Sequence, residues 1–162
     1  MAVLLTGCGK KEIKNEIVVK EIGLKMKIPA GWQLGIPSIH PGKKYRVSPT
    51  GDHCFPSEKS SYPFGRVWVM DLAPFSSLKE FVSTTPTLHG LTVTQVPMQI
   101  CGYEGFEIIS SGLGENRVPV QGVYQYIRKG DKVIVVSFLT LADSFATQES
   151  LFRLSLKSLV IE

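Results

Sequence analysis

The stretch Gly122-Val-Tyr-Gln-Tyr-Ile-Arg-Lys-Gly-Asp-Lys-Val-Ile-Val-Val-Ser-Phe-Leu139 contains two apolar segments around a short polar connection. β-Branched and aromatic residues favour strands, and Lys129-Gly-Asp-Lys132 contains the glycine that a tight hairpin turn needs. The stretch therefore predicts an antiparallel β-hairpin with strands at 122–128 and 133–139.

The rest of the chain adds strands and two helices. Residues 16–28 alternate apolar and polar side chains, which predicts one strand with one covered face, and Pro29-Ala-Gly-Trp32 turns the chain into a new strand. Further strands are expected at 44–47, 66–72, 91–96 and 100–109, with a bend or bulge at Gly102 and Gly105. Helices are expected at 76–83, with a capping box of Ser77 and Glu80, and from Asp143 or Ser144 to Ser158.

These elements predict the fold class. Hairpin connections predominate and helices separate groups of strands, so we expect an α+β fold, a mainly antiparallel β-sheet sandwiched by helices. The chain has 162 residues, enough for one domain, which we place at 16–162. The sequence has no apolar run near the roughly 18 residues that a membrane-spanning helix needs.

The chain carries a net charge of +4 and has a pI near 9.0. The lysines and arginines are spread along the sequence, and no basic and aromatic stripe accompanies them. We therefore expect no nucleic-acid partner; solubility and attraction to an anionic lipid surface are the interpretations that fit.

Leu5-Thr-Gly-Cys8 resembles the lipobox of bacterial lipoproteins. In that family a diacylglycerol is attached to the cysteine thiol, the peptide is cut just before the cysteine, and the new amine receives an acyl chain such as palmitate. The resemblance implies that residues 1–7 are a residual signal peptide, that Cys8 is lipidated, and that residues 8–15 form a tether. It also implies a bacterial cell-envelope location, on the inner or outer membrane, with the domain outside the cytoplasm.

The segment before the box departs from a full signal peptide. It is short and contains no lysine or arginine, whereas a signal peptide has a basic region and 7–15 apolar residues. The alternative is a short apolar strand with an incidental cysteine.

Two further cysteines, Cys54 and Cys101, are candidates for a disulfide, because an exported protein meets oxidising conditions. The sequence does not show whether their Cα atoms lie within the distance that a disulfide requires. Two separate thiols are therefore the alternative.

Asp52-His53-Cys54 is the most reactive combination of side chains in the sequence. It could serve a cysteine- or metal-dependent enzyme, but adjacent residues rarely converge on one ion, and neighbouring side chains in a strand point in opposite directions. No phosphate-binding loop, dinucleotide-binding motif or nucleophile elbow is present. We expect no catalytic residue, no metal and no cofactor, and keep this enzyme as the alternative hypothesis.

The irregular region between residues 37 and 64 mixes aromatic and basic residues, a composition favoured at protein interfaces. The candidate partner-binding residues are Tyr45, Arg46, Phe55, Tyr62 and Phe64. The alternative is that this region simply packs over the sheet.

Several segments together resemble the PsbP-like and DcrB-type lipoprotein domains: a first strand leading into Ile28-Pro-Ala-Gly-Trp32, a helix at Ser77-Leu-Lys-Glu80, and Gly102-Tyr-Glu-Gly-Phe106 before paired strands. The terminal helix running into Ser155-Leu-Lys-Ser-Leu-Val-Ile161 completes the resemblance. It implies an antiparallel sheet with helices on both faces and a largely non-enzymatic, protein-binding role.

The resulting hypothesis is a membrane-anchored envelope lipoprotein whose domain is a non-catalytic binding or assembly module. Its membrane contact would be the lipid on Cys8, and a membrane-associated protein would be its partner. A photosystem-associated or cytosolic adaptor protein of the same fold remains a further alternative.

Overall fold

The computed structural model describes residues 12–35, 44–48, 62–84, 91–114 and 117–162. The first half contains the strands β1 (Ile13–Val19), β2 (Leu24–Pro29), β3 (Gln33–Leu34), β4 (Lys44–Ser48) and β5 (Phe64–Asp71), the short 3₁₀ turn η1 (Lys20–Ile22), and helix α1 (Leu78–Thr84). The second half contains β6 (Leu91–Ile100), β7 (Tyr103–Leu113), β8 (Pro119–Lys129), β9 (Lys132–Leu141), η3 (Ala142–Ser144), α2 (Phe145–Lys157) and β10 (Val160–Ile161).

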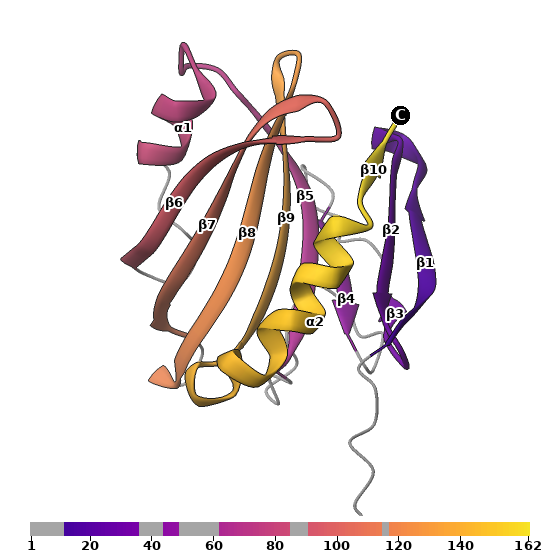
Figure 1. The fold of residues 1–162 in the computed structure, drawn as a ribbon. Helices are drawn as coiled ribbons and strands as arrows, with labels where there is room; N and C mark the ends of the chain where they lie inside the picture. Colours follow the sequence, from indigo (N-terminus) through magenta and orange to yellow (C-terminus); the bar gives the residue numbers. More distant parts are fainter. Residues whose placement is uncertain (1–11, 36–43, 49–61, 85–90, 115–116) are drawn as a thin grey trace, which may run out of the picture.

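Two antiparallel sheets build the molecule. A seven-stranded sheet has the order β3-β4-β5-β9-β8-β7-β6, and a three-stranded sheet has the order β1-β2-β10 (Figure 1). The predicted hairpin is confirmed as β8 and β9, near the middle of the large sheet, with Lys129 paired to Lys132. Gly130 takes a φ of +65° in its two-residue turn, a backbone conformation that glycine adopts without strain.

The layers confirm a mainly antiparallel arrangement covered on both faces and refine the expected sandwich. Helix α1 covers one face of the large sheet through Leu78, Phe81 and Val82. The opposite face is covered by α2 together with the three-stranded sheet (Figure 1). One covering layer is therefore largely β-structure, because the β1–β2 hairpin supplies an apolar face of its own.

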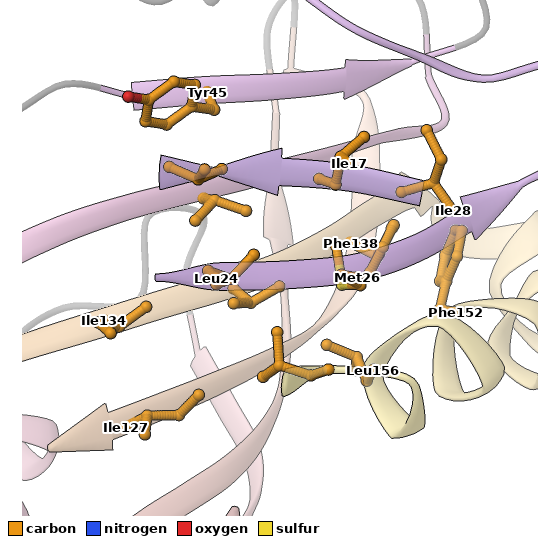
Figure 2. Close-up of a cluster of buried hydrophobic side chains, with 14 of the residues drawn as sticks. Ile17, Leu24, Met26, Ile28, Tyr45, Ile127, Ile134, Phe138, Phe152 and Leu156 are labelled. Atoms are coloured by element: carbon orange, nitrogen blue, oxygen red, sulfur yellow. The ribbon is translucent and has the colours of Figure 1, made fainter. Parts of the chain in front are cut away.

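The space between the two sheets is a continuous apolar core, which we call the inter-sheet core. Leu24, Met26 and Ile28 of β2 project towards Ile134 and Phe138 of β9 (Figure 2). Phe152 of α2 stacks on Phe138 with ring centroids 5.1 Å apart, and Trp32 lies 6.1 Å from the Phe138 ring. Burying each such side chain stabilises the fold by about 1.5–3 kcal/mol, which fixes the small sheet onto the large one.

Two strand predictions are wrong in the same way. Residues 16–28 form the β1–β2 hairpin with η1 at its tip, where Gly23 has a φ of +66°. The expected strand 100–109 is interrupted at once by the turn that joins β6 to β7, where Cys101 and Gly102 have φ values of +53° and +82°. Alternation is interrupted only briefly, at Lys20-Glu21 and at Cys101-Gly102, so these short turns were included in the predicted strands.

The predicted capping of α1 is confirmed in one half. Ser77 Oγ accepts a hydrogen bond from the Glu80 amide at 3.2 Å. The Glu80 carboxylate accepts instead from the amide and hydroxyl of Ser76, at 2.9 and 2.7 Å. These hydrogen bonds lower the pKa of Glu80. Among the described residues, no helix is both long and apolar enough to cross a membrane.

Candidate functional site: the cleft between the two sheets

Several residues that the sequence predicted for function lie outside the described residues. They are Cys8, the Asp52-His53-Cys54 tripeptide and Phe55. Within the described ranges, no group of three or more histidine, cysteine, aspartate or glutamate side chains gathers in a metal-binding arrangement. The lipidation and enzyme hypotheses therefore rest on the sequence alone.

The predicted aromatic partner surface is not one surface. Tyr45 is 6% exposed and belongs to the inter-sheet core, whereas Phe64 is 3% exposed and packs on the α1 side of the large sheet. Tyr62 is half-buried and stacks on Phe64, with ring centroids 5.3 Å apart. Arg46 lies in β4, and its side chain is outside the description. Strand alternation places Tyr45 and Phe64 on opposite faces, which corrects the prediction of a shared interface.

Cys101 is a free thiol in the structure. Its Sγ donates to the carbonyl oxygen of Leu159 at 3.1 Å, which ties the β6–β7 turn to the segment after α2. Cys54 lies outside the described residues, so the Cys54–Cys101 disulfide stays a prediction.

The described residues form a cleft of about 500 Å³ where the inter-sheet core opens to solvent. We call it the inter-sheet cleft. It is lined by Lys20, Glu21, Ile22, Gly23, Val69, Lys129, Lys132, Ile134 and Glu162. The lining comes from η1, β5, the β8–β9 hairpin and the end of β10, which meet at the upper end of the molecule in Figure 1.

The floor of this cleft is apolar. Val69 and Ile134 are partners in the β5–β9 ladder, so their side chains lie next to each other on the face that meets the small sheet. Ile134 is 1% exposed, while Val69 and Ile22 are half-buried. The floor therefore offers a ligand an apolar surface, and this surface is continuous with the inter-sheet core.

The rim of the cleft carries three ammonium groups. Lys132 pairs with Asp71 and lies 3.8 Å from Asp131, and these two carboxylates raise its pKa. Lys20 is exposed and forms no ion pair within the described part of the chain. The exposed pairs of Lys132 are weak in water, so a ligand anion can compete for that ammonium.

Lys129 holds the two sheets together across the cleft. Its Nζ donates to the carbonyl oxygen of Ile22 at 3.3 Å and to that of Glu162. The Glu162 amide in turn donates to the carbonyl oxygen of Gly23 at 2.9 Å. A side chain at residue 23 would place its Cβ 2.8 Å from the Glu162 oxygen, so this close approach requires glycine.

Tyr45 closes the neighbouring part of the core. Burial, followed by the nearby Glu21 carboxylate, raises the pKa of Tyr45 to about 12. The hydroxyl therefore stays protonated at neutral pH, which argues against a proton-transfer role. The partner-binding role predicted for Tyr45 is replaced by a structural one.

Strand β6 is a second exposed feature. Residues 92–99 are all exposed and none of them is charged, and Val93, Val96 and Met98 are 56%, 53% and 38% exposed. Among the described strands, β6 is the edge of the large sheet, and its outward backbone groups have no partner there. Such an edge favours association unless something interrupts it, and Pro97 does so.

Sequence reasoning missed the cleft residues. The sequence pattern places Lys129 and Lys132 in the predicted hairpin turn and Lys20 within the predicted strand 16–28. The only local signal is Gly23, which interrupts an otherwise alternating segment and marks a turn or a close backbone approach.

The fold is similar to that of solved structures. The solution structure of cyanobacterial PsbP (CyanoP) from Synechocystis is 14% identical, with a TM-score of 0.63, over 98% of this chain and 99% of that chain. The crystal structure of LpqN, involved in cell envelope biogenesis of Mycobacterium tuberculosis, is 13% identical, with a TM-score of 0.57, over 91% of this chain and 89% of that one. No protein-family model and no curated protein matches the sequence. At these identities the comparison shows a shared PsbP-like fold, as the resemblance implied.

Proposed function

We propose that the chain is a lipid-anchored protein of the bacterial cell envelope, with the lipid on Cys8, and that its domain is a non-catalytic protein-binding or assembly module. The observation that carries the proposal is the Leu5-Thr-Gly-Cys8 sequence directly before a single folded domain. The described fold starts at Glu12, whose carbonyl oxygen accepts from the Ala30 amide at 2.9 Å, and β1 begins at Ile13, so the tether is shorter than the expected 8–15.

The short spacing between Cys8 and β1 limits how far the domain can lie from the membrane. Residues 9–12 span at most about 14 Å when fully extended, so a lipid on Cys8 keeps the start of β1 near the membrane surface. Lys10 and Lys11 lie in this tether and favour an anionic lipid surface. β1 is about 23 Å long, so the inter-sheet cleft at its far end can lie up to about that much further from the lipid than the start of β1 does.

A neighbour with the same fold supports the envelope part of the proposal. LpqN, a protein of cell envelope biogenesis, and CyanoP share the fold across nearly the whole chain. Anchoring raises the effective concentration of the domain for partners in the same membrane, which is how a module with a modest affinity can still act.

The anchor is tested by the intact mass of the protein from a bacterial membrane fraction, expressed from the gene with its full upstream region. We expect a chain that begins at Cys8 and carries added acyl mass, and a Cys8→Ser variant that loses both features. An unmodified chain that retains Met1 would contradict the anchor.

The binding role is tested in the same membranes. A photo-crosslinking residue at the exposed position Val18 or Lys20 is expected to give one reproducible protein adduct that needs Cys8. Thiol alkylation distinguishes the enzyme alternative: a rapidly alkylated, low-pKa Cys54 with no adduct from either crosslinking position would replace the binding module by an enzyme.

A further inference from the structure

The inter-sheet cleft combines a hydrocarbon floor with a cationic rim. Its volume of about 500 Å³ lies inside the range of roughly 300–1,000 Å³ that small-molecule sites occupy. The floor is the Val69–Ile134 ladder pair with Ile22 beside it, and the rim carries Lys20, Lys129 and Lys132.

We propose that the inter-sheet cleft binds a monomeric anionic amphiphile, a single short acyl or alkyl chain ending in a carboxylate or phosphate. The apolar chain packs against Val69, Ile134 and Ile22, and the acidic head lies among the lysines. This inference goes beyond the proposed function, because it concerns a small ligand and requires neither the lipid on Cys8 nor a protein partner.

The charge balance of the rim selects an anionic head over a neutral or cationic one. The lining contains three lysines against Glu21 and Glu162, and Glu162 is already paired with Lys25. Lys20 is unpaired within the described residues, and the Lys132 pairs are exposed to solvent. The head group of a ligand can therefore pair with the available ammonium of Lys20, and it can replace a carboxylate that is paired with Lys132.

The floor selects an amphiphile over a bare anion. A small ion would contact the lysines but leave Val69 and Ile22 exposed to water, whereas an alkyl chain removes their surface from water at about 25 cal/mol per Å². The rim residues Lys20, Lys132 and Glu162 are charged and exposed to water, so a dissolved monomer is the expected form of the ligand.

The test is a titration of the ¹⁵N-labelled full chain with octanoate below its micelle concentration, followed by amide chemical shifts. We expect saturable shifts at Gly23, Val69 and Ile134. Lys20→Gln should weaken binding by roughly two- to fivefold, the effect of one exposed ion pair. Lys79→Gln, on α1 at the opposite face of the sheet, should leave the affinity unchanged.

A second variant and a ligand series test the two halves of the proposal separately. Val69→Thr, which keeps the shape of the side chain but adds a hydroxyl, should weaken octanoate binding, and its circular-dichroism spectrum should show that the fold is kept. Octanol, octylammonium, acetate and inorganic phosphate should each bind more weakly than octanoate.

Four results would overturn the proposal. They are equal binding of octanol or octylammonium, equal binding of acetate or phosphate alone, octanoate shifts that map away from the cleft, and binding to anionic phospholipid vesicles while octanoate leaves the cleft amides unchanged.

Discussion

Phe138 occupies the space that a side chain at residue 65 would need. Gly65 and Phe138 are partners in the β5–β9 ladder, and a Cβ built on Gly65 would lie 2.9 Å from Phe138 Cε1. The Phe138 ring is also stacked against Phe152, 5.1 Å between centroids, so it cannot simply move aside. Glycine at position 65 is thus a packing requirement of the inter-sheet core.

We predict that Gly65→Ala lowers the free energy of unfolding by about 1–3 kcal/mol, because the added methyl group overpacks the core. Phe138→Leu should relieve this clash, so the double variant should lose less than the sum of the single losses, with a coupling of about 1 kcal/mol. Urea unfolding of the four proteins measures the cycle. Additive losses would show that the ring and the glycine do not compete for space.

The next prediction concerns the interrupted edge of β6. Ile100 and Tyr103 flank a two-residue turn, so they form a hydrogen-bonded pair, and alternation puts Pro97, opposite Phe106, at a non-hydrogen-bonded position. The proline nitrogen therefore faces outward and removes one donor from the free edge. Pro97→Thr restores that donor and should increase self-association, as measured by sedimentation.

The control for this variant adds a charge to the same edge. In Pro97→Thr/Gln99→Lys, the lysine should return the protein to the monomer by charge repulsion between paired edges. If Pro97→Thr sediments as the parent protein does at every concentration, the proline is not what protects the edge.

Three of the five tyrosines should make stability fall at high pH. Burial raises the pKa of Tyr126 to about 12 and that of Tyr124 further, and burial with Glu21 raises the pKa of Tyr45 to about 12. The unfolded chain loses these protons first, near pH 10, so stability is complete below pH 10 and decreases as the pH rises towards 12. Absorbance at 295 nm should show their ionisation only as the domain unfolds.

Tyr126→Phe is the matched variant for this effect, since it removes one titrating hydroxyl and keeps the ring. Its stability should decrease less steeply between pH 10 and 12 than that of the parent. An unchanged slope would contradict the protonated, buried state of Tyr126 in the fold.

The hydrogen bonds of Lys129 should stabilise the contact between the two sheets. Lys129→Met removes the donations to Ile22 and Glu162 while keeping the aliphatic stem, and should lower the free energy of unfolding by about 1–2 kcal/mol. Amide exchange at Glu162, which donates to Gly23, should become faster. Lys157→Met, on the exposed side of α2, serves as the control and should change neither quantity.

The strands and helices were largely predictable because they depend on local patterns. Alternating β-branched residues predicted β8 and β9, and Ser77 with Glu80 predicted the start of α1. The pattern failed around Gly23 and at Cys101-Gly102, where the chain reverses at only a short interruption of the alternation. It also could not tell that Tyr45 and Phe64 lie in two different cores.

The amino-acid sequence by itself determined the antiparallel class, the central hairpin, the lipobox resemblance at Cys8 and the charge of the chain. The tertiary structure alone decided the inter-sheet cleft, because its lining comes from segments as distant as Ile22 and Lys129, 107 positions apart. Local periodicity specifies which face of a strand is buried, but the pairing of β2 with β10 and the packing of two sheets specify which faces meet. The packing of the two sheets against each other places three lysines around the apolar floor of the cleft.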